Sequence, residues 1–333
     1  MSAGETKPRV GFLGVGWIGR HRMQGILETG AVEIIAVADP SAEMAAQAAA
    51  LVPQAVVGAT IEDVLGQDLD GLVIATPSAQ HASQAIQALE RGVAVFCQKP
   101  LGRSATEVQQ VVEAARAADR LLGVDFSYRH TAGIQAIRSL VQVGELGAIR
   151  AIDLTFHNAY GPDKPWFYDR ALSGGGCLID LGVHLIDLAL WVLDFPEVSD
   201  VQGHLLSNGK LLDPQPQEVE DYALASFRLG SGTLVRLACS WRLPAGRDAV
   251  IGAEFYGEKG GAALKNVDGS FYDFTAELYR GTAREVLVTP PDQWGIRAAQ
   301  DWARRLAWDG RYHPEAERFA AVSEVLDRIY GVV

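Results

Sequence analysis

The stretch RVGFLGVGWIGRHRMQGILETGAVEIIAVAD, residues 9–39, decides the fold of the first part of the chain. An apolar run at 9–13 leads into a glycine-rich turn, a helical pattern at 17–29 and a second apolar run at 33–38. Two short apolar strands separated by one helix are typical of a β-α-β unit with parallel strands. The sequence therefore predicts a turn that joins a strand directly to the start of a helix.

The same alternation continues to residue 126. Its further strand candidates are 72–75, 93–97 and 122–126, and its further helix candidates are 41–51, 80–91 and 104–118. Continuous apolar strands that alternate with helices indicate a parallel sheet covered on both faces. We therefore expect a doubly wound α/β domain over residues 1–126.

From residue 127 onward, strands follow one another along the chain. The strand candidates are 149–156, 221–229, 233–241, 250–257 and 284–289, and the helix candidates are 131–143, 177–193, 292–309 and 314–330. Consecutive strands joined by glycine-containing turns favour antiparallel pairing. We expect residues 127–333 to form an α+β domain with a mostly antiparallel sheet and helices on one face. The C-terminal helix is placed to pack back on the first domain.

Composition and charge restrict the possible partners. The 333 residues are 48% hydrophobic and 21% charged, which is typical of a globular chain of about two domains. The net charge is −12, which repels nucleic-acid phosphates and anionic lipid, so neither nucleic acid nor membrane is an expected partner. The three cysteines lack the short spacings of a zinc ribbon or a disulfide framework. The first residues carry no apolar signal-peptide stretch, which predicts a cytoplasmic protein.

The glycine turn has the spacing of a dinucleotide site. Gly14, Gly16 and Gly19 form the pattern GxGxxG between a strand and a helix, so main-chain amides at the helix start are free to bind a pyrophosphate. Asp39 follows Gly19 by 20 residues, at the end of the next strand. A carboxylate there accepts hydrogen bonds from ribose hydroxyls and repels a 2′-phosphate. Residues 40–46 contain no Arg or Lys, so we expect NAD rather than NADP.

Three further motifs bring polar side chains to the ends of predicted elements. Thr76-Pro77, with His81 four residues later, closes one strand, and Gln98-Lys99-Pro100 closes another. The carboxyl ends of strands in an open α/β sheet are where ligands bind. The third motif, SGGGCLIDLGVH at 173–184, carries Asp180 and His184 four apart on a predicted helix, so both project from the same face.

In this order the motifs resemble those of the Gfo/Idh/MocA oxidoreductases, a family of sugar and cyclitol dehydrogenases and reductases. The resemblance spans nearly the whole chain, and it implies that Lys99, Asp180 and His184 are the catalytic residues at the nicotinamide. It also implies a cis bond before Pro100. The chain departs from the family at Gln98, where a Glu is usual. The residues expected at the cofactor are Gly14, Gly16, Trp17, Ile18, Gly19, Asp39, Thr76, Pro77, His81 and Gln98.

The chemistry of alcohol oxidation gives each of the three residues a role. Oxidation of a secondary alcohol sends a hydride to the nicotinamide and a proton to a base. Histidine titrates near neutral pH, so His184 is the expected acid/base group. Lys99 is expected to donate a hydrogen bond to the reacting oxygen. Asp180 is expected to orient His184 or to hold a neighbouring substrate hydroxyl.

A loop at 157–173 has the composition of a sugar site. It is rich in Asn, Tyr, Trp and Arg, which supply hydrogen bonds and flat apolar faces. The predicted substrate-binding residues are Lys99, Tyr128, Arg129, Asn158, Trp166, Tyr168, Asp180 and His184, with Tyr160, Arg170 and His130 as further candidates. The expected substrate is a small polyhydroxylated molecule.

The predicted helix also offers an alternative, a metal site. Cys177, Asp180, His184 and Asp187 lie on one stripe of the predicted helix. One helix seldom supplies four tetrahedral ligands without partners from elsewhere. We therefore expect no metal.

Two other functions remain open. One is a redox glycosidase of the same family that retains its NAD, and the other is a non-enzymatic nucleotide- or sugar-binding regulator. The direction of hydride transfer is also open. An open sheet face in the second domain favours a homodimer or homotetramer.

Overall fold

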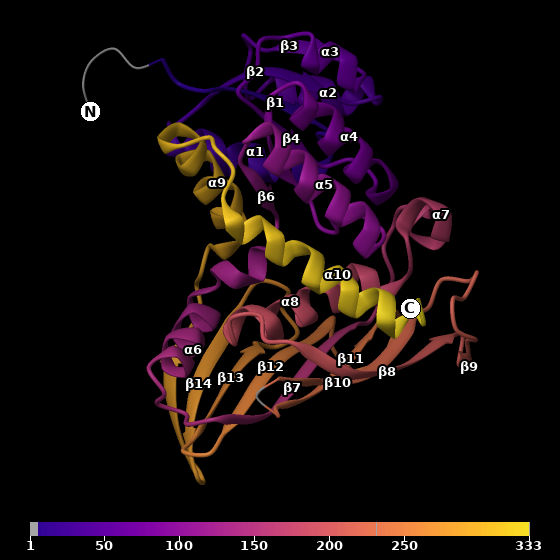
Figure 1. The fold of residues 1–333 in the computed structure, drawn as a ribbon, viewed down its shortest axis with the longest axis vertical. Coiled ribbons are helices and arrows are strands. Elements are labelled where there is room, and N and C mark those ends of the chain that lie inside the picture. Colours follow the sequence, from indigo (N-terminus) through magenta and orange to yellow (C-terminus); the bar gives the residue numbers. More distant parts are fainter. Residues whose placement is uncertain (1–5, 231, 333) are drawn as a thin grey trace. The chain divides into compact units, whose positions relative to one another are not determined.

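The chain folds into two compact units in this computed structural model, which describes residues 6–230 and 232–332 (Figure 1). The first, called here the α/β unit, comprises the chain up to Gly102, Thr106–Asp125 and Ile296–Ala320. The second, called the sheet unit, comprises Arg103–Ala105, Phe126–Gly295 and the chain from Ala321 onward. The domain limits drawn from the sequence, 1–126 and 127–333, stay a prediction.

The α/β unit is built on a six-stranded parallel sheet. Its strands are β1 (Arg9–Leu13), β2 (Glu33–Ala38), β3 (Val56–Gly58), β4 (Gly71–Ile74), β5 (Ala94–Cys97) and β6 (Leu122–Val124). Their order is β3-β2-β1-β4-β5-β6, the order of a Rossmann fold, with the crevice at the carboxyl ends of β1 and β4. The doubly wound α/β prediction is confirmed.

Helices cover both faces of this sheet. They are α1 (Trp17–Thr29), α2 (Ala42–Ala49), α3 (Ile61–Leu65), α4 (Ser78–Glu90), α5 (Ala105–Ala118) and α9 (Arg297–Trp308). β3 and α3 were missed in the sequence. β3 has three residues, none of them buried, and α3 has five, so neither leaves a clear periodic pattern.

α9 returns late in the chain to pack on the α/β unit. Its Trp302 is buried and lies against Phe96 of β5, with the ring centroids 5.8 Å apart. A Cβ on Gly71 of β4 or Gly123 of β6 would come within 2.8–2.9 Å of the Trp302 ring. The absence of side chains at these two positions therefore makes room for an indole on the sheet.

The sheet unit contains nine strands. They are β7 (Ile149–Asn158), β8 (Val198–Ser207), β9 (Lys210–Leu211), β10 (Tyr222–Leu229), β11 (Leu234–Ser240), β12 (Ala249–Gly257), β13 (Gly261–Asn266), β14 (Phe274–Arg280) and β15 (Ala283–Val288). Their order is β15-β14-β13-β12-β7-β11-β10-β8-β9. All neighbours are antiparallel except β7 and β11, so the prediction of a mostly antiparallel sheet is confirmed.

Four of these strands were missed in the sequence. β9 is only two residues long, and β13 begins with the small residues Gly-Ala-Ala. β14 does alternate buried and half-buried residues, and this pattern was overlooked. β8 is ten residues long but only Leu205 and Ser207 in it are buried, so its apolar signal is weak. β8, β9 and β13 are held by pairing with their neighbours rather than by a strong pattern of their own.

The helices of this unit are α6 (Ala132–Gln142), α7 (Arg170–Ser173) and α8 (Val183–Val192), with α10 (Arg318–Ile329) shared along the chain between the two units. α8 packs on β7 and β11 and α6 packs on β13 and β14, and Figure 1 shows both on one side of the sheet. The stretch Arg170–Val192 is long and apolar enough to cross a membrane, but 94% of its most apolar window is buried. It is a core segment.

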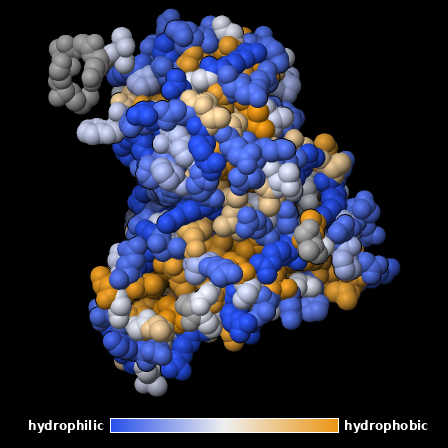
Figure 2. Space-filling view, in the orientation of Figure 1, coloured by the Kyte–Doolittle hydropathy of each residue, from blue (hydrophilic) through white to orange (hydrophobic). Residues whose placement is uncertain are grey.

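The opposite face of this sheet carries ion pairs across its strands. Asp153 on β7 pairs with Arg236 on β11 at 2.8 Å, and Glu254 on β12 pairs with Lys265 on β13. Leu234 is 62% exposed on the same sheet. Hydrophilic residues also cover most of the visible surface of the α/β unit (Figure 2). The net charge of −12 therefore lies on a surface with many local ion pairs.

Candidate functional site

The glycine turn leaves room for a ligand at one of its three glycines. Gly14 has φ +81°, and a Cβ there would lie 2.6 Å from the main chain of Ala75. A Cβ on Gly19 would lie 2.2 Å from the carbonyl oxygen of Gly14, so this glycine is required by close packing. A Cβ on Gly16 would meet nothing within 4 Å. Gly16 therefore lines open space at the start of α1, where a pyrophosphate approaches in folds of this kind.

Asp39 is fixed at the carboxyl end of β2. Its Oδ2 accepts a hydrogen bond from the Val15 amide and its Oδ1 accepts one from the Ser41 amide, each at 2.9 Å. The carboxylate thus connects the glycine turn to the residue that caps α2. Each oxygen keeps a second lone pair for a ribose hydroxyl.

Arg20 brings a guanidinium to the same place. It projects from α1, and its Nη1 donates to the Val15 carbonyl oxygen at 2.7 Å and lies 3.2 Å from the Met44 sulfur on α2. Residues 40–46, which directly follow Asp39, contain no Arg or Lys that could bind a 2′-phosphate. Arg20 is therefore a cation near the Asp39 turn that sequence spacing did not indicate.

His81 links two strand-end loops. It is 1% exposed, and its Nδ1 lies 2.6 Å from the Pro100 carbonyl oxygen while its Nε2 lies 2.7 Å from the Thr76 carbonyl oxygen. Burial lowers the pKa of His81, and the charge of Lys99 acts in the same direction, whereas the two carbonyls act against them. A neutral ring carries one N–H and donates to one carbonyl at a time. From its buried position, His81 therefore links the loop after β4 at Thr76 to the loop after β5 at Pro100.

The turn that carries Lys99 follows β5. The bond between Lys99 and Pro100 is cis, as the resemblance implied. Gln98 is half-buried, and its Nε2 donates to Oδ2 of Asp125, which follows β6. Lys99 is therefore flanked by a fixed amide on one side and by Pro100, held by His81, on the other.

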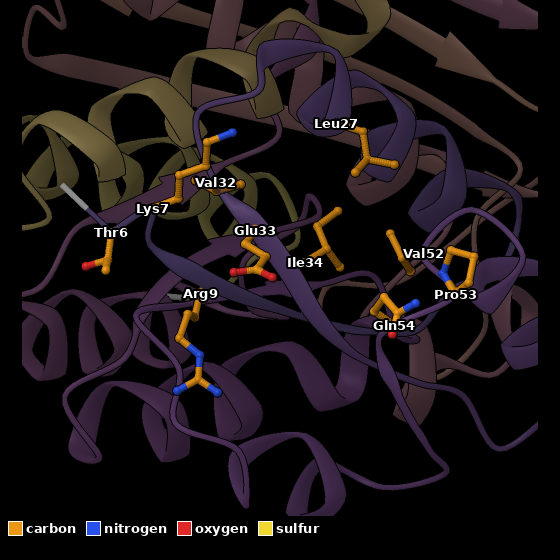
Figure 3. Close-up of a pocket in the computed structure, with 10 residues that line it drawn as sticks. All are labelled: Thr6, Lys7, Arg9, Leu27, Val32, Glu33, Ile34, Val52, Pro53 and Gln54. Atoms are coloured by element: carbon orange, nitrogen blue, oxygen red, sulfur yellow. The ribbon is translucent and has the colours of Figure 1, made fainter. Parts of the chain in front are cut away.

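One pocket of the α/β unit lies at the amino ends of β1 and β2. Its volume is about 580 Å³, and its walls include Arg9 at the start of β1 and Glu33 at the start of β2 (Figure 3). Ligands of open α/β sheets bind at the carboxyl ends of strands. This pocket is at the amino ends, so it does not belong to the candidate cofactor site.

In the sheet unit, a buried carboxylate holds the triple-glycine turn. Glu220 is 0% exposed, and its Oε1 accepts the amides of Gly176 and Leu178 at 2.9 Å and the Tyr330 hydroxyl at 2.7 Å. Burial raises the pKa of Glu220. A Cβ on Gly175 would lie 2.1 Å from the Tyr330 hydroxyl. Gly175 and Gly176 are therefore required by contact with Tyr330 and Glu220.

Asp180 lies on a π-helical turn, Leu178–Gly182, and not on a regular α-helix as predicted. Such turns widen a helix by one residue and recur at functional sites. The indole Nε1 of Trp241 donates to Oδ2 of Asp180 at 3.1 Å. Trp241 directly follows β11, which runs parallel to β7. It therefore lies at the carboxyl ends of these two strands, next to His157 and Asn158 in the register.

His184 lies at the start of α8 and is 7% exposed. Its ring packs edge-on against Tyr128, with the centroids 4.8 Å apart. Tyr128 in turn contacts Phe156, Phe274 and Trp294, and burial raises its pKa. Tyr128 is thus a buried packing partner of His184.

Comparison with known proteins agrees with this geometry. A family model described as "Oxidoreductase family, NAD-binding Rossmann fold" matches residues 8–126, and one described as "GFO/IDH/MocA C-terminal domain" matches residues 134–263. The chain belongs to the Gfo/Idh/MocA oxidoreductase family. It is an NAD(P)-binding member, because the matched Rossmann domain carries the glycine turn and Asp39 described above.

Several relatives in this family have assigned activities. D-glucoside 3-dehydrogenase of Escherichia coli is 29% identical over 71% of this chain and 66% of its own length. Inositol 2-dehydrogenase 3 of Saccharopolyspora erythraea is 29% identical over 90% of this chain and 80% of its own. The solved structure of GenD2 from gentamicin A biosynthesis, in complex with NAD, has a TM-score of 0.82 at 24% identity and covers 99% of this chain and 95% of its own. The similarity to GenD2, at 24% identity, shows a shared fold.

The expected catalytic residues of this Gfo/Idh/MocA protein are divided between the units. Lys99 belongs to the α/β unit, and Asp180 and His184 belong to the sheet unit. Their meeting at a nicotinamide stays a prediction. Trp17 and Ile18 are 58% and 36% exposed at the glycine turn, and Trp17 stacks on His21.

Arg129 has a structural partner that the sequence did not indicate. It is 6% exposed, and its Nε donates to Asp187 at 2.8 Å while Nη2 donates to the other carboxylate oxygen. Phe126, Trp191 and Phe195 surround the guanidinium at 4.9–5.8 Å. A cation buried in this way holds α8 to the residues after β6. The substrate-binding role predicted for Arg129 gains no support from this placement.

The loop residues divide into those that pack and those that face outward. Tyr168 lies 5.6 Å from the Trp241 ring and donates to the Pro162 carbonyl oxygen, while Trp166 stacks on Phe167. Arg170 lies over the Tyr330 ring at 4.7 Å. Asn158 ends β7, and its Oδ1 is a buried acceptor that no described residue satisfies. Tyr160 is 52% exposed and packs on Phe271.

The residues of the helical stripe that could form a metal site have separate partners. Asp187 pairs with Arg129, Asp180 accepts from Trp241, and Cys177 packs on Cys239 with each sulfur 3.5 Å from the other's carbonyl oxygen. Over residues 6–230 and 232–332, no three His, Cys, Asp or Glu side chains are grouped as a metal site requires. No step of the chemistry is assigned to a metal.

Proposed function

We propose that this chain is an NAD-dependent dehydrogenase or reductase that acts on a secondary alcohol or ketone of a sugar, a sugar derivative or a cyclitol. The observation that carries the proposal is the open glycine turn at Gly16 next to a fixed carboxylate at Asp39. The substrate class is supported by the two relatives that act on a glucoside and on inositol.

NAD supplies one thing when bound, a carbon atom that accepts or returns a hydride. Lys99 then donates a hydrogen bond to the reacting oxygen and stabilises its negative charge. His184 takes the hydroxyl proton during oxidation and returns it during reduction. Asp180, held by Trp241, orients His184 or a neighbouring hydroxyl. Asn158 and Tyr168 are the loop residues proposed to hold further hydroxyls.

NAD is proposed over NADP because Asp39 opposes a 2′-phosphate. Replacing Asp39 by Ala is expected to raise NADP affinity relative to NAD by about tenfold or more, since removing a like charge favours the phosphate. The matched control adds Arg20→Ala to the Asp39→Ala variant. It removes the cation that contacts Met44 beside that turn. Calorimetric titration with both nucleotides measures the ratio.

The deciding experiment is a screen of sugars, cyclitols and sugar acids with NAD and with NADP, in both directions, following the reduced cofactor. Turnover that releases NADH supports the proposal. Liberated sugar with a cofactor that never leaves the protein would instead establish the redox glycosidase. Tight NAD binding without any turnover would establish the regulator.

The acid/base role of His184 has its own measurement. Replacing His184 by Asn is expected to lower turnover and to remove the pH dependence near neutrality, because a histidine proton is the one that titrates there. A pH profile that keeps its shape in this variant would exclude His184 as the base.

A homo-oligomer and a cytoplasmic location are proposed as well. Sedimentation of the purified protein tests the oligomeric state.

A further inference from the structure

A buried carboxylate at the end of β6 connects the glycine helix to the Lys99 turn. Asp125 is 1% exposed, and its amide donates to the Cys97 carbonyl oxygen at the end of β5. Its Oδ2 receives the Arg22 Nε at 2.6 Å and the Gln98 Nε2. One oxygen atom therefore joins α1, β5 and β6.

One partner of this carboxylate is a buried arginine. The Arg22 and Asp125 side chains are 8% and 0% exposed, and a buried carboxylate persists beside an arginine because the ion pair offsets its lost hydration. Arg22 also donates from Nη1 to His21 Nδ1 at 2.8 Å, and burial, with the Arg22 charge, lowers the pKa of His21. The network thus runs from the exposed Trp17–His21 stack into the sheet.

Gln98 occupies a position where the family usually has Glu, and the structure shows why a carboxylate there would be unfavourable in this chain. The Gln98 amide is a donor to Asp125. A Glu at 98 would place two carboxylates against each other, and one of them would have to take up a proton. The chain therefore keeps one carboxylate in this network and contributes it from residue 125.

The other oxygen of Asp125 remains unsatisfied. Oδ1 is buried, and no described residue donates a hydrogen bond to it. Leaving a buried acceptor without a donor is costly, so Oδ1 calls for a donor other than the described residues. The nicotinamide half of the dinucleotide carries donors of the right kind, namely its ribose hydroxyls and its carboxamide N–H groups.

We propose that Asp125 is a positioning residue for the nicotinamide half of the cofactor and for Lys99, and that it supplies from β6 the carboxylate that Gln98 lacks. Asp125 holds the Gln98 amide, which precedes Lys99 directly, and it anchors α1 through Arg22. This proposal rests on the proposed function, because it requires that the chain bind NAD.

The test moves the carboxylate back to residue 98. Three variants are compared with the wild type: Asp125→Asn, Gln98→Glu, and the double variant that carries both. Affinities for NAD and for ADP, which lacks the nicotinamide half, are measured by calorimetry, and the melting temperature is measured for each protein. Asp119→Asn is the control, because it removes a carboxylate from an exposed ion pair with Arg311 in the same unit.

Asp125→Asn is expected to weaken NAD binding by about tenfold or more, the size of a charge-assisted hydrogen bond, and to leave ADP binding within about twofold. Gln98→Glu alone is expected to weaken NAD binding too, because it adds a second carboxylate. The double variant is expected to regain most of the lost NAD affinity, and Asp119→Asn to change neither affinity.

Three results would overturn the proposal. A double variant no better than Asp125→Asn would show that residue 98 cannot take over the carboxylate. An equal loss of ADP affinity in Asp125→Asn would show that Asp125 only supports the fold. A wild type that does not bind NAD would overturn the proposed function as well, whereas wild-type binding without rescue overturns only the role of Asp125.

Discussion

Both units bury a carboxylate beneath a turn that carries a candidate catalytic residue, but the two carboxylates have different partners. Asp125 lies below the Lys99 turn and pairs with the Arg22 guanidinium. Glu220 lies below the glycine turn that leads to Asp180 and accepts two amides and the Tyr330 hydroxyl. The first therefore forms a buried ion pair. Burial without a cation raises the pKa of the second.

The two carboxylates thus differ in their partners: Asp125 is paired with a cation, whereas Glu220 accepts hydrogen bonds from two amides and a hydroxyl. Each has one buried oxygen that no described residue satisfies, Oδ1 of Asp125 and Oε2 of Glu220. Burial raises the pKa of Glu220, whereas its hydrogen bonds to two amides and to Tyr330 act against that rise. Asp125 is paired with the Arg22 guanidinium, whose Nε lies 2.6 Å from its Oδ2.

The largest expected effect is on turnover. Lys99→Ala should lower kcat by about a thousandfold, because it removes the hydrogen bond to the reacting oxygen. NAD affinity should stay within about twofold, since Lys99 acts on the substrate. Steady-state kinetics with the substrate found in the screen, together with NAD titration, gives both numbers. Unchanged turnover would remove Lys99 from the mechanism.

The next effect is on stability in the sheet unit. Glu220→Ala should lower the free energy of unfolding by about 3–5 kcal/mol, because it leaves two amides and a hydroxyl buried without an acceptor. Glu220→Gln keeps one carbonyl oxygen in place and should lose less than half as much. Urea unfolding measures both. Equal losses in the two variants would show that the hydrogen bonds are not what Glu220 contributes.

The two glycine turns should respond in opposite ways to an added methyl group. Gly176→Ala brings a Cβ within 1.9 Å of the Glu220 carbonyl oxygen and should destabilise the protein by about 2–3 kcal/mol. Gly16→Ala meets no protein atom within 4 Å and should leave the melting temperature unchanged while it weakens NAD binding by about tenfold. Thermal unfolding with and without NAD separates the two. A strongly destabilised Gly16→Ala would mean that the turn has no open space.

The smallest effect concerns acid stability. Burial lowers the pKa of His81 below its ordinary 6.5, so the unfolded chain binds a proton in a pH range where the folded chain does not. The free energy of unfolding should therefore fall as the pH drops below about 6.5, by at most about 1.4 kcal/mol per pH unit for this group, and level off below the folded pKa.

His81→Gln should flatten that fall relative to the wild type. The control is His313→Gln, because that side chain is 60% exposed and caps a short surface turn. His21 and His157, whose pKa values burial also lowers, should keep part of the slope in every variant. An identical slope in His81→Gln and the wild type would contradict the lowered pKa. Urea unfolding across the acid range measures the slopes.

The parts of the protein that the sequence predicted well are those whose cause is local. β1 and β2 were predicted to the residue, because apolar runs and the GxGxxG spacing are read along the chain. The α-helix expected through Asp180 was wrong in detail, since the segment contains a π-helical turn. The amides of Gly176 and Leu178 at the start of this segment donate to Glu220, which is 44 residues from Gly176 along the chain and gives no local signal.

Sequence spacing by itself determined the glycine turn, the carboxylate that follows it and the alternation of strands and helices in the first unit, because each follows from the conformational limits of a few neighbouring residues. The tertiary structure alone decided which polar groups meet. Arg22 reaches Asp125 across 103 residues, Tyr330 reaches Glu220 across 110, and Trp241 reaches Asp180 because β11 lies parallel to β7. Such partners are chosen by strand register and packing, and no pattern within a single segment of the chain encodes them.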